Sequence, residues 1–259
     1  MMRQQDTPRF LYKFRCLNKD TEAMLTRGEL HFEIPTELND PIECLPVFCV
    51  ECSEEEFREA IRQQISVTYP DYSANQIDKA TLAESYPPPQ SKLDSFRSRF
   101  QEHVERAGVF SASERWGSIV MWSHYADRHR GICLELDIRT LPDDLQFHRV
   151  VYSNERPHVN LFTDWQESHK ITVLTKNDEW CYEAEWRMVL HSPPSAPDFP
   201  GEADAPKDFI HGVILGARMK PEDRETVLGW VYQMSPRPKL YEASVDEQTY
   251  RINRQELSD

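Results

Sequence analysis

The sequence predicts an α+β fold in which a mixed, mainly antiparallel sheet forms the core and a helical insertion interrupts it. Short apolar or alternating segments, which are typical of strands, occur near both ends of the chain. The middle of the chain, at about residues 53–107, instead carries apolar residues at helical spacing. No internal repeat or clear boundary is visible, so we expect residues 1–259 to form a single domain.

The N-terminal segment combines a strand with a short helix. Residues 9–14 read RFLYKF, and this aromatic, mostly alternating pattern predicts the first strand. Residues 19–30 predict a helix whose start is capped by Asp20 or Thr21. Gly28 suits the left-handed conformation that ends many helices, so extended structure is expected to resume after it.

The helical middle of the chain has a clear start signal. Ser53 and Glu56 can form a capping box at the head of a helix over residues 53–69. One face of this helix carries the apolar residues Phe57, Ala60, Ile61 and Ile65. The prolines in residues 86–90 interrupt helical structure, and a further helix is expected around residues 93–104.

The C-terminal half alternates strands with helices. Strands are predicted at residues 108–113, 131–137, 146–152, 184–191, 210–216 and 239–245, and helices from Thr163 and from Pro221 to about Gln233. Ser111 and Glu114 suggest the capped start of another helix. Residues 192–206 are rich in proline and predict a surface loop.

Composition narrows the classes of function. The chain has 44 acidic and 30 basic residues and a formal net charge of −14, which works against broad association with bulk nucleic acid or an anionic membrane. No segment approaches the roughly 18 apolar residues that a membrane-spanning helix needs, and the N-terminus lacks the apolar stretch of a signal peptide. We therefore expect a cytoplasmic protein without membrane partners.

The six cysteines are scattered along the chain and are not expected to form disulfide bonds. Cys44, Cys49 and Cys52 lie close enough together to suggest zinc. A structural zinc site needs four ligands, however, and no second pair of Cys or His follows at a suitable distance. We therefore predict no metal site and interpret these residues as thiols on strands.

A first candidate for function is the segment WSHYADRHRGICLELD, residues 122–137. A helix continuing through this segment would carry Ile119, Trp122, Tyr125, Ala126 and His129 on one face, with His124 off that face. The rings of Trp, Tyr and His can bury their bodies while each keeps one hydrogen-bonding atom. Such a face suits the wall of a cleft, and it equally suits a packing helix whose polar atoms bond to neighbouring backbone.

A second candidate is the segment DEWCYEAEWRMVLH, residues 178–191. On a strand over residues 182–190, alternation would place Glu183, Glu185 and Arg187 on one face. Unpaired charges are costly to bury. That face therefore meets solvent, ion-pair partners or a ligand, and the neighbouring aromatic Tyr182 favours a cleft.

Further candidates lie near the N-terminus. Arg15 ends the first strand, where a guanidinium group can bind two oxygens of a ribose or phosphate. Asn39 and Asp40, in the turn-like segment TELNDPIEC, are either site residues or simply turn formers. Arg15 could also brace a loop carboxylate such as Asp40. The chain has only eight glycines and no phosphate-binding glycine loop, zinc-binding His-Glu-x-x-His helix or Gly-x-Ser-x-Gly elbow.

Several uncommon sequence motifs occur in this order along the chain: LYKFR, GELHF, NDP, WSHYADRHRGICLELD, VVYS, Lys176 and WCYEAEWRMV. Together they resemble the bacterial family described as domain of unknown function 2971. The resemblance implies a bacterial cytoplasmic protein and suggests a role in defence against phage.

The order of the candidate site residues along the chain also resembles that of ADP-ribosyltransferases, although the chain has no Ser-Thr-Ser motif. In that family a residue of the first strand holds a ribose, a central tyrosine stacks on nicotinamide, and a late Glu-x-Glu strand supplies a carboxylate beside the breaking bond. The resemblance assigns these roles to Arg15, Tyr125 and Glu185, with Glu183 as the first acid. It implies NAD as a co-substrate.

From these candidates we predict that Glu185, Tyr125 and Arg15 are catalytic and that three distant segments of the chain meet at one pocket. The predicted substrate-binding residues are Tyr12, Asn39, Asp40, Trp122, His124, His129, Lys176, Tyr182, Glu183 and Arg187. Two alternatives stay open. The first is a hydrolase or nuclease that uses His124 or His129 with Asp40 and Glu185. The second is a binding or sensor module that recognises a phage or host component without turnover.

Overall fold

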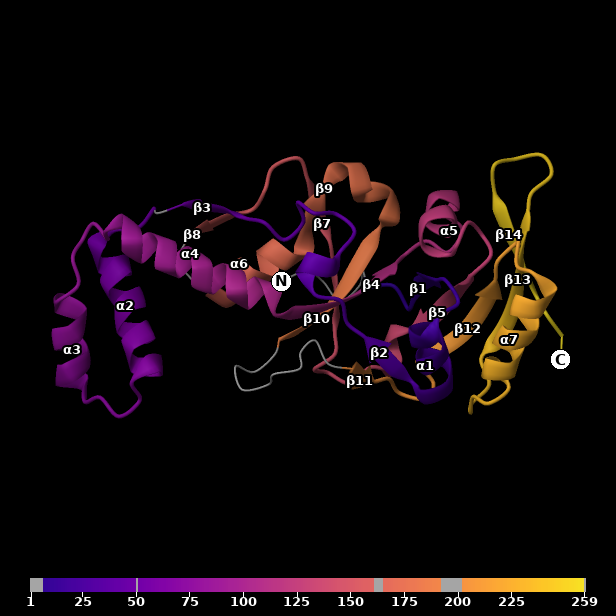
Figure 1. Ribbon diagram of the computed structural model, residues 1–259, viewed down its shortest axis with the longest axis horizontal. Helices are drawn as coiled ribbons and strands as arrows, with labels where there is room; N and C mark the ends of the chain where they lie inside the picture. Colours follow the sequence, from indigo (N-terminus) through magenta and orange to yellow (C-terminus); the bar gives the residue numbers. More distant parts are fainter. Residues whose placement is uncertain (1–6, 50, 161–164, 192–201, 259) are drawn as a thin grey trace.

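The computed structural model describes residues 7–49, 51–160, 165–191 and 202–258. Its core is an eight-stranded sheet with the order β14-β13-β12-β5-β1-β4-β10-β6 (Figure 1). In that order the strands are β14 (Ile252–Glu256), β13 (Lys239–Val245), β12 (Ile210–Leu215), β5 (Ile132–Asp137), β1 (Phe10–Arg15), β4 (Ala107–Ser113), β10 (Glu185–His191) and β6 (Phe147–Arg149). Neighbouring strands are antiparallel except β12 and β13, which are parallel. The α+β fold with a mixed, mainly antiparallel sheet is thus confirmed.

Three small two-stranded sheets flank the core. They are the antiparallel pair β2 (Glu29–His31) with β11 (Glu202–Asp204), and the parallel pairs β3 (Val47–Cys49) with β8 (His158–Asn160) and β7 (Val151–Ser153) with β9 (Thr175–Asn177). The pairing of β3 with β8 joins segments that are more than a hundred residues apart in the chain. The pairing of β7 with β9 joins the two segments on either side of α6.

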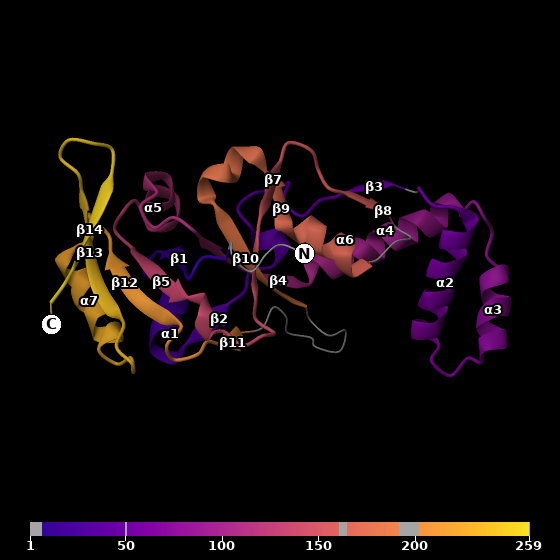
Figure 2. The ribbon, with the colours of Figure 1, turned by 180° about the vertical axis from the view of Figure 1, so that it is seen from behind.

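The helices are α1 (Lys19–Arg27), α2 (Glu54–Thr68), α3 (Ala74–Leu82), α4 (Gln90–Glu105), α5 (Ile119–Tyr125), α6 (Trp165–Leu174) and α7 (Pro221–Val231), with the short 3₁₀-helices η1 (Pro35–Glu37), η2 (Ile138–Thr140) and η3 (Asp178–Glu183). Figures 1 and 2 show α2 and α3 at one end of the molecule, joined to the sheet by α4, and α7 with β13 and β14 at the other end. We call α2, α3 and α4 the helical arm. Within the described residues, no helix has the length and apolar character needed to cross a membrane.

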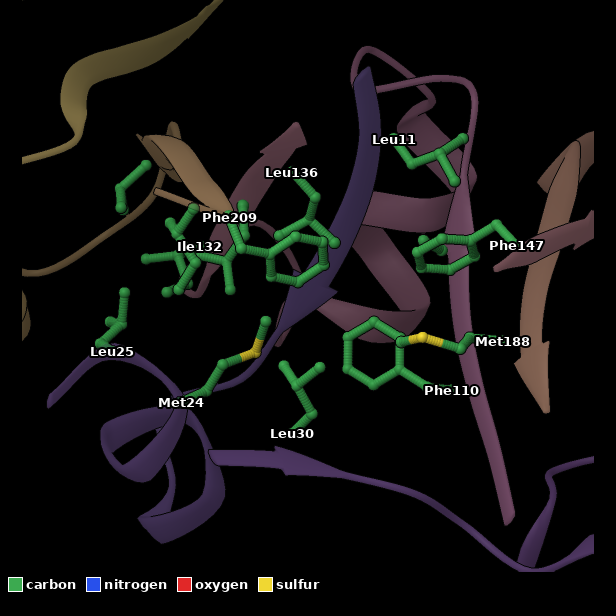
Figure 3. Close-up of a cluster of buried hydrophobic side chains, with 14 of the residues drawn as sticks. Leu11, Met24, Leu25, Leu30, Phe110, Ile132, Leu136, Phe147, Met188 and Phe209 are labelled. Carbon is green, nitrogen blue, oxygen red and sulfur yellow. The ribbon is translucent and has the colours of Figure 1, made fainter. Parts of the chain in front are cut away.

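The main apolar core lies between one face of the sheet and helices α1 and α7. Figure 3 shows Met24 and Leu25 of α1 facing Ile132, Phe110 and Met188, which come from three different strands. Transfer of each such side chain out of water contributes about 1.5–3 kcal/mol. A second cluster, on the α5 side of the sheet, includes Phe14, Trp122, Cys133 and Ile214.

Local signals explain several helix ends. Gly28 has φ 75° and caps α1 in the left-handed region, as expected. The start of α1 is capped by Asn18, whose side chain accepts a hydrogen bond from the Thr21 backbone. The prediction of Asp20 or Thr21 as the cap was therefore wrong by two or three residues. The asparagine precedes both residues and offers the same kind of acceptor oxygen.

Other boundaries also differ from the predictions. The strand expected at residues 146–152 is divided into β6 and β7, because β6 pairs with β10 whereas β7 pairs with β9. Ser111 lies in β4 and starts no helix, and Ser118 caps α5 instead. Of the loop expected at residues 192–206, residues 192–201 lie outside the described residues, and 202–204 form strand β11. Thr163, the expected start of a helix, also lies outside them.

The middle helices follow the sequence closely, whereas the cysteines do so only in part. Cys49 lies on β3 as expected, but Cys44 is buried at a left-handed residue and Cys52 lies in the segment before α2, so the expectation of strand positions was wrong for these two. Helices α2 and α4 lie where apolar spacing predicts them, and α3 is an additional helix that the spacing did not indicate.

The capping box of α2 offers a test of local stability. Ser53 Oγ accepts a hydrogen bond from the Glu56 backbone, and the Glu56 side chain accepts one from the Ser53 backbone. Replacing Ser53 with alanine is expected to destabilise α2 by about 1 kcal/mol, because one amide of the first turn loses its acceptor. Amide hydrogen exchange in α2 measures this change. Ser66→Ala, an exposed substitution in the same helix, should leave the exchange equal or slower.

Candidate functional site

A cavity opens where β1 and β4 separate within the sheet. The two strands pair only at Tyr12 and Ser113, and farther along β4 the chain is bridged instead by Glu33 at Val109. Between these two points the cavity has a volume of about 500 Å³. This size is in the range of pockets that hold small molecules, which is roughly 300–1,000 Å³.

Three distant segments meet at this cavity. Arg15 from the end of β1, Tyr125 from the end of α5 and Glu185 from the start of β10 all line it. In Figure 1, β1, β4 and β10 lie side by side, and α5 lies next to β1. The structure therefore brings together the three residues that the sequence predicts to be catalytic, and their catalytic role stays a prediction.

Four buried charged side chains line the wall of the cavity, and a fifth, Glu43, forms ion pairs with two of them. We call Glu43, Lys176, Glu183, Glu185 and Arg187 the charged cluster. None of the five is more than 7% exposed, and Arg187 is fully buried. The alternative of a solvated sheet face is therefore wrong. Three carboxylates face two cations, so the cluster carries an excess of acidic groups that burial makes costly.

Glu185 is held as an anion. Its Oε1 accepts a hydrogen bond from Arg187 Nε at 2.8 Å. Its Oε2 accepts from Lys176 Nζ at 3.1 Å and from a second nitrogen of Arg187 at 3.1 Å. Burial alone would raise the pKa of Glu185, but Arg187 and Lys176 outweigh burial and lower the pKa to about 2.

Glu183 has the opposite electrostatic environment. Its Oε1 accepts a hydrogen bond from the Tyr125 hydroxyl at 2.5 Å, and its Oε2 accepts one from Lys176 Nζ at 2.7 Å. Burial and the neighbouring Glu185 raise the pKa of Glu183 above its ordinary value, although Lys176 and Tyr125 act in the other direction. The pKa of Tyr125 is also raised, first by burial and then by Glu183. Asn39 Nδ2 donates to the same hydroxyl at 3.0 Å.

The chain between the two glutamates is not a continuous strand. Glu183 ends η3, and Ala184 takes a left-handed conformation with φ 45° before β10 begins at Glu185. The expected strand over residues 182–190 was therefore wrong at its start. The turn is fixed by hydrogen bonds from the Ala184 backbone to Cys181 and from the Glu114 backbone to Ala184. It allows both carboxylates to reach the same lysine.

Arg187 and Lys176 connect the cavity to the rest of the fold. Arg187 also donates to Glu43 and, at 2.6 Å, to the carbonyl oxygen of Val173. Lys176 Nζ lies 3.7 Å from Glu43 and 5.0 Å from the centre of the Trp180 ring. Lys176 thus holds both Glu183 and Glu185, Arg187 holds Glu185, and both cations line the cavity.

Four of the remaining predicted residues also line the cavity: Tyr12, Arg15, Asn39 and His124. Three of them are already engaged, and Asn39 is one of these through its hydrogen bond to Tyr125. Arg15 Nε donates to Thr21 at 3.1 Å and forms an ion pair with Asp20 at 3.5 Å. The Tyr12 hydroxyl donates to Glu135 at 3.2 Å.

Trp122 and His129 do not line the cavity. The helix ends at Tyr125, and residues 127–129 all have positive φ values, so His129 is not on the helical face that the sequence predicts. Trp122 is fully buried and donates to the Trp116 carbonyl at 2.8 Å. Its ring stacks on His129 with centres 6.1 Å apart. Both side chains therefore contribute to packing and not to the wall of the cavity.

Asp40 and Tyr182 also lie away from the main cavity. Asp40 accepts hydrogen bonds from the Ile42 backbone and from Trp180 Nε1, each at 3.0 Å, so it closes a turn and holds an indole. It lines a second, smaller cavity of about 120 Å³, which also contacts Lys176. Tyr182 lies in η3 and packs against the apolar cluster of α5.

The sequence reasoning missed Lys13. Its side chain lines the cavity, and its Nζ donates to the Ser111 carbonyl at 2.8 Å. Alternation along β1 places Lys13 and Arg15 on the same side of the strand, so the signal was present in the sequence. Across the residues that the structure describes, no three His, Cys, Asp or Glu side chains are grouped so as to hold a metal ion.

A family model described as protein of unknown function (DUF2971) matches residues 121–188. The matched segment contributes Tyr125, Lys176, Glu183, Glu185 and Arg187 to the cavity wall. The match supports the resemblance to this family, and the comparisons lend no support to the likeness to ADP-ribosyltransferases. Comparisons with curated proteins and with solved structures find no match.

Proposed function

We propose that the cavity is the active site of an enzyme that breaks the N-glycosidic bond of a nucleotide such as NAD, in the manner of an ADP-ribosyltransferase. One observation supports this proposal above all others. Glu183 and Glu185 share one lysine at the cavity wall, yet their environments displace their pKa values in opposite directions. Two carboxyl groups separated in this way are suited to different roles in acid–base chemistry.

Glu185 is the candidate for electrostatic stabilisation. Breaking a bond between ribose and a charged base leaves positive charge on the sugar. A carboxylate that stays ionised beside the sugar stabilises that charge in the transition state more than in the bound substrate. Arg187 holds Glu185 in one orientation from two nitrogens, so little reorganisation is needed when the charge develops.

Glu183 is the candidate for proton transfer. A carboxyl group with a raised pKa can accept a proton from the attacking water or hydroxyl group and release it later. Its hydrogen bond to Tyr125 keeps the Glu183 carboxyl group at the C-terminal end of α5, beside the cavity. The Tyr125 ring offers a flat surface for a base, and Arg15 offers a guanidinium group for ribose or phosphate oxygens.

The proposal predicts measurable effects of two conservative substitutions on nicotinamide release from NAD. Glu185→Gln is expected to lower the rate by about 10²–10³-fold, as loss of a preorganised electrostatic group does. Glu183→Gln is expected to lower it by about 10²–10⁴-fold, as loss of an acid–base group does. Glu225→Gln, at an exposed position on α7, should leave the rate unchanged. Circular dichroism melting checks that each variant is folded.

Other outcomes separate the alternatives. No nicotinamide release by the wild-type protein, with and without cell extract as a source of acceptor, would reject the proposal. A metal-dependent cleavage of nucleic acid would favour the hydrolase or nuclease. Partner binding that survives Glu185→Gln would favour a sensor module.

We further propose that this activity serves defence against phage, as the resemblance to the family suggests. Bacteria that express the wild-type chain should then be protected from infection. The same two glutamine variants should lose protection together with nicotinamide release.

A further inference from the structure

Lys13 is placed where a lysine is seldom found. It is half-buried at the point where β1 and β4 separate, and it lines the cavity. The Nζ donates to the Ser111 carbonyl at 2.8 Å and lies 4.0 Å from the centre of the Phe110 ring. In the part of the chain that the structure describes, no carboxylate forms an ion pair with it. Lysines withdrawn from water normally have such a partner.

Burial and the neighbouring Arg15 favour the neutral form of Lys13. Arg15 lies two residues along the same strand, Glu33 lies on the segment after β2, and Glu185 lies on β10. Burial and then Arg15 lower the pKa of Lys13 to about 7, although Glu33 and Glu185 act in the opposite direction. Much of Lys13 is therefore a neutral amine at neutral pH, with a lone pair available for reaction. Desolvation beside a second cation is an established way to activate a lysine.

We propose that Lys13 is a nucleophilic amine that forms an imine with a carbonyl compound bearing an anionic group. The lone pair of Nζ attacks the carbonyl carbon. The carbonyl oxygen then leaves as water with the two protons of the amine, and a carbon–nitrogen double bond remains. Arg15, on the same side of β1 and lining the same cavity, is the binding group for the anion. This inference does not depend on the proposed cleavage of NAD, which makes no use of Lys13.

Reductive trapping tests the proposal directly. The wild-type protein is incubated with pyridoxal 5′-phosphate, an aldehyde that carries a phosphate, and reduced with borohydride. Labelled lysines are then mapped by mass spectrometry. At pH 7, Lys13 should be labelled at least about tenfold faster than the exposed Lys79, because a large share of Lys13 is the unprotonated, reactive amine there. Labelling of Lys13 no faster than that of Lys79 would overturn the proposal.

The pH profile and two variants sharpen the test. The rate at Lys13 should rise with pH and level off above about 7. Lys13→Met should remove the label from the peptide that contains residue 13 and from no other peptide. Arg15→Leu should slow labelling by pyridoxal 5′-phosphate more than labelling by pyridoxal, which lacks the phosphate. Equal slowing of the two reagents would overturn the role of Arg15. All readouts are peptide labels, so they are independent of NAD turnover.

Discussion

Replacing Arg187 with methionine is expected to lower the free energy of unfolding by about 3–5 kcal/mol, the cost of removing one partner from a buried ion pair. Arg187 is fully buried and donates to Glu43, to Glu185 and to the Val173 carbonyl. Without it, three buried carboxylates would face Lys176 alone. Methionine fills much of the same volume, so the effect reports mainly the loss of charge and hydrogen bonds.

Chemical denaturation of the wild-type and Arg187→Met proteins measures this difference. Arg251→Met is the matched control, because Arg251 is exposed, and it should change stability by less than about 0.5 kcal/mol. The pH dependence gives a second check. The pKa of Glu185 is lowered in the folded protein, so its contribution is present above its unfolded pKa of about 4.3. The difference between the two proteins should therefore narrow as the pH falls from there toward 2. A difference below 1 kcal/mol at neutral pH would contradict the assignment of Arg187 as the main counter-charge.

Replacing Gly131 with alanine is expected to destabilise the fold by about 3 kcal/mol or more, at the upper end of the cost of overpacking. A Cβ atom at this position would lie 2.2 Å from the Arg15 carbonyl oxygen and 3.1 Å from the Ala126 carbonyl group. Both obstacles are backbone atoms, so no side chain can move aside. The strand β5 would have to withdraw from the end of β1, which carries Arg15 into the cavity.

Thermal and chemical denaturation of Gly131→Ala test this expectation against a second glycine. Gly229 lies within α7, and a Cβ atom there would meet nothing within 4 Å. Gly229→Ala should therefore stabilise the protein by about 0.5–1 kcal/mol, because alanine is the better helix former. If the two alanine variants were equally stable, the close approach at Gly131 would be refuted.

The parts of the fold that depend on local patterns could be predicted from the sequence. The start of α2 depends on two side chains three residues apart, and the end of α1 depends on one glycine. The central strands β1 and β5 lie on segments rich in apolar and aromatic residues, and this composition alone predicts strands. These features could be predicted because the residues that determine them lie within a few positions of one another in the chain.

The turn after α5 could not be predicted in this way. Apolar spacing continues from Trp122 through Ala126 to His129, so a helix was the natural expectation. The chain instead turns through three left-handed residues, and the His129 backbone donates to the Trp122 carbonyl. Gly131 donates back to the Ala126 carbonyl and packs on Arg15. The close approach of Gly131 to β1, a strand more than a hundred residues earlier, therefore constrains the end of this turn.

The candidate site was partly visible in the sequence. Arg15, Tyr125 and Glu185 were expected to converge, and all three line the cavity. Whether Glu183 and Glu185 were buried or solvated could not be decided locally, because the cluster around them also includes Glu43, which lies 144 residues before Arg187 in the chain. Lys13 is different, since its place beside Arg15 follows from simple alternation and was overlooked among the aromatic residues of β1.

The junction between the helical arm and the sheet has a mechanical consequence. Only Arg106 separates the end of α4 from the start of β4, and Phe100 and Val104 of α4 pack in one cluster with Val109 of β4. A displacement of α4 would therefore reach β4 through these packed side chains. Because β4 carries the Ser111 carbonyl that holds Lys13, the helical arm and the cavity share this strand.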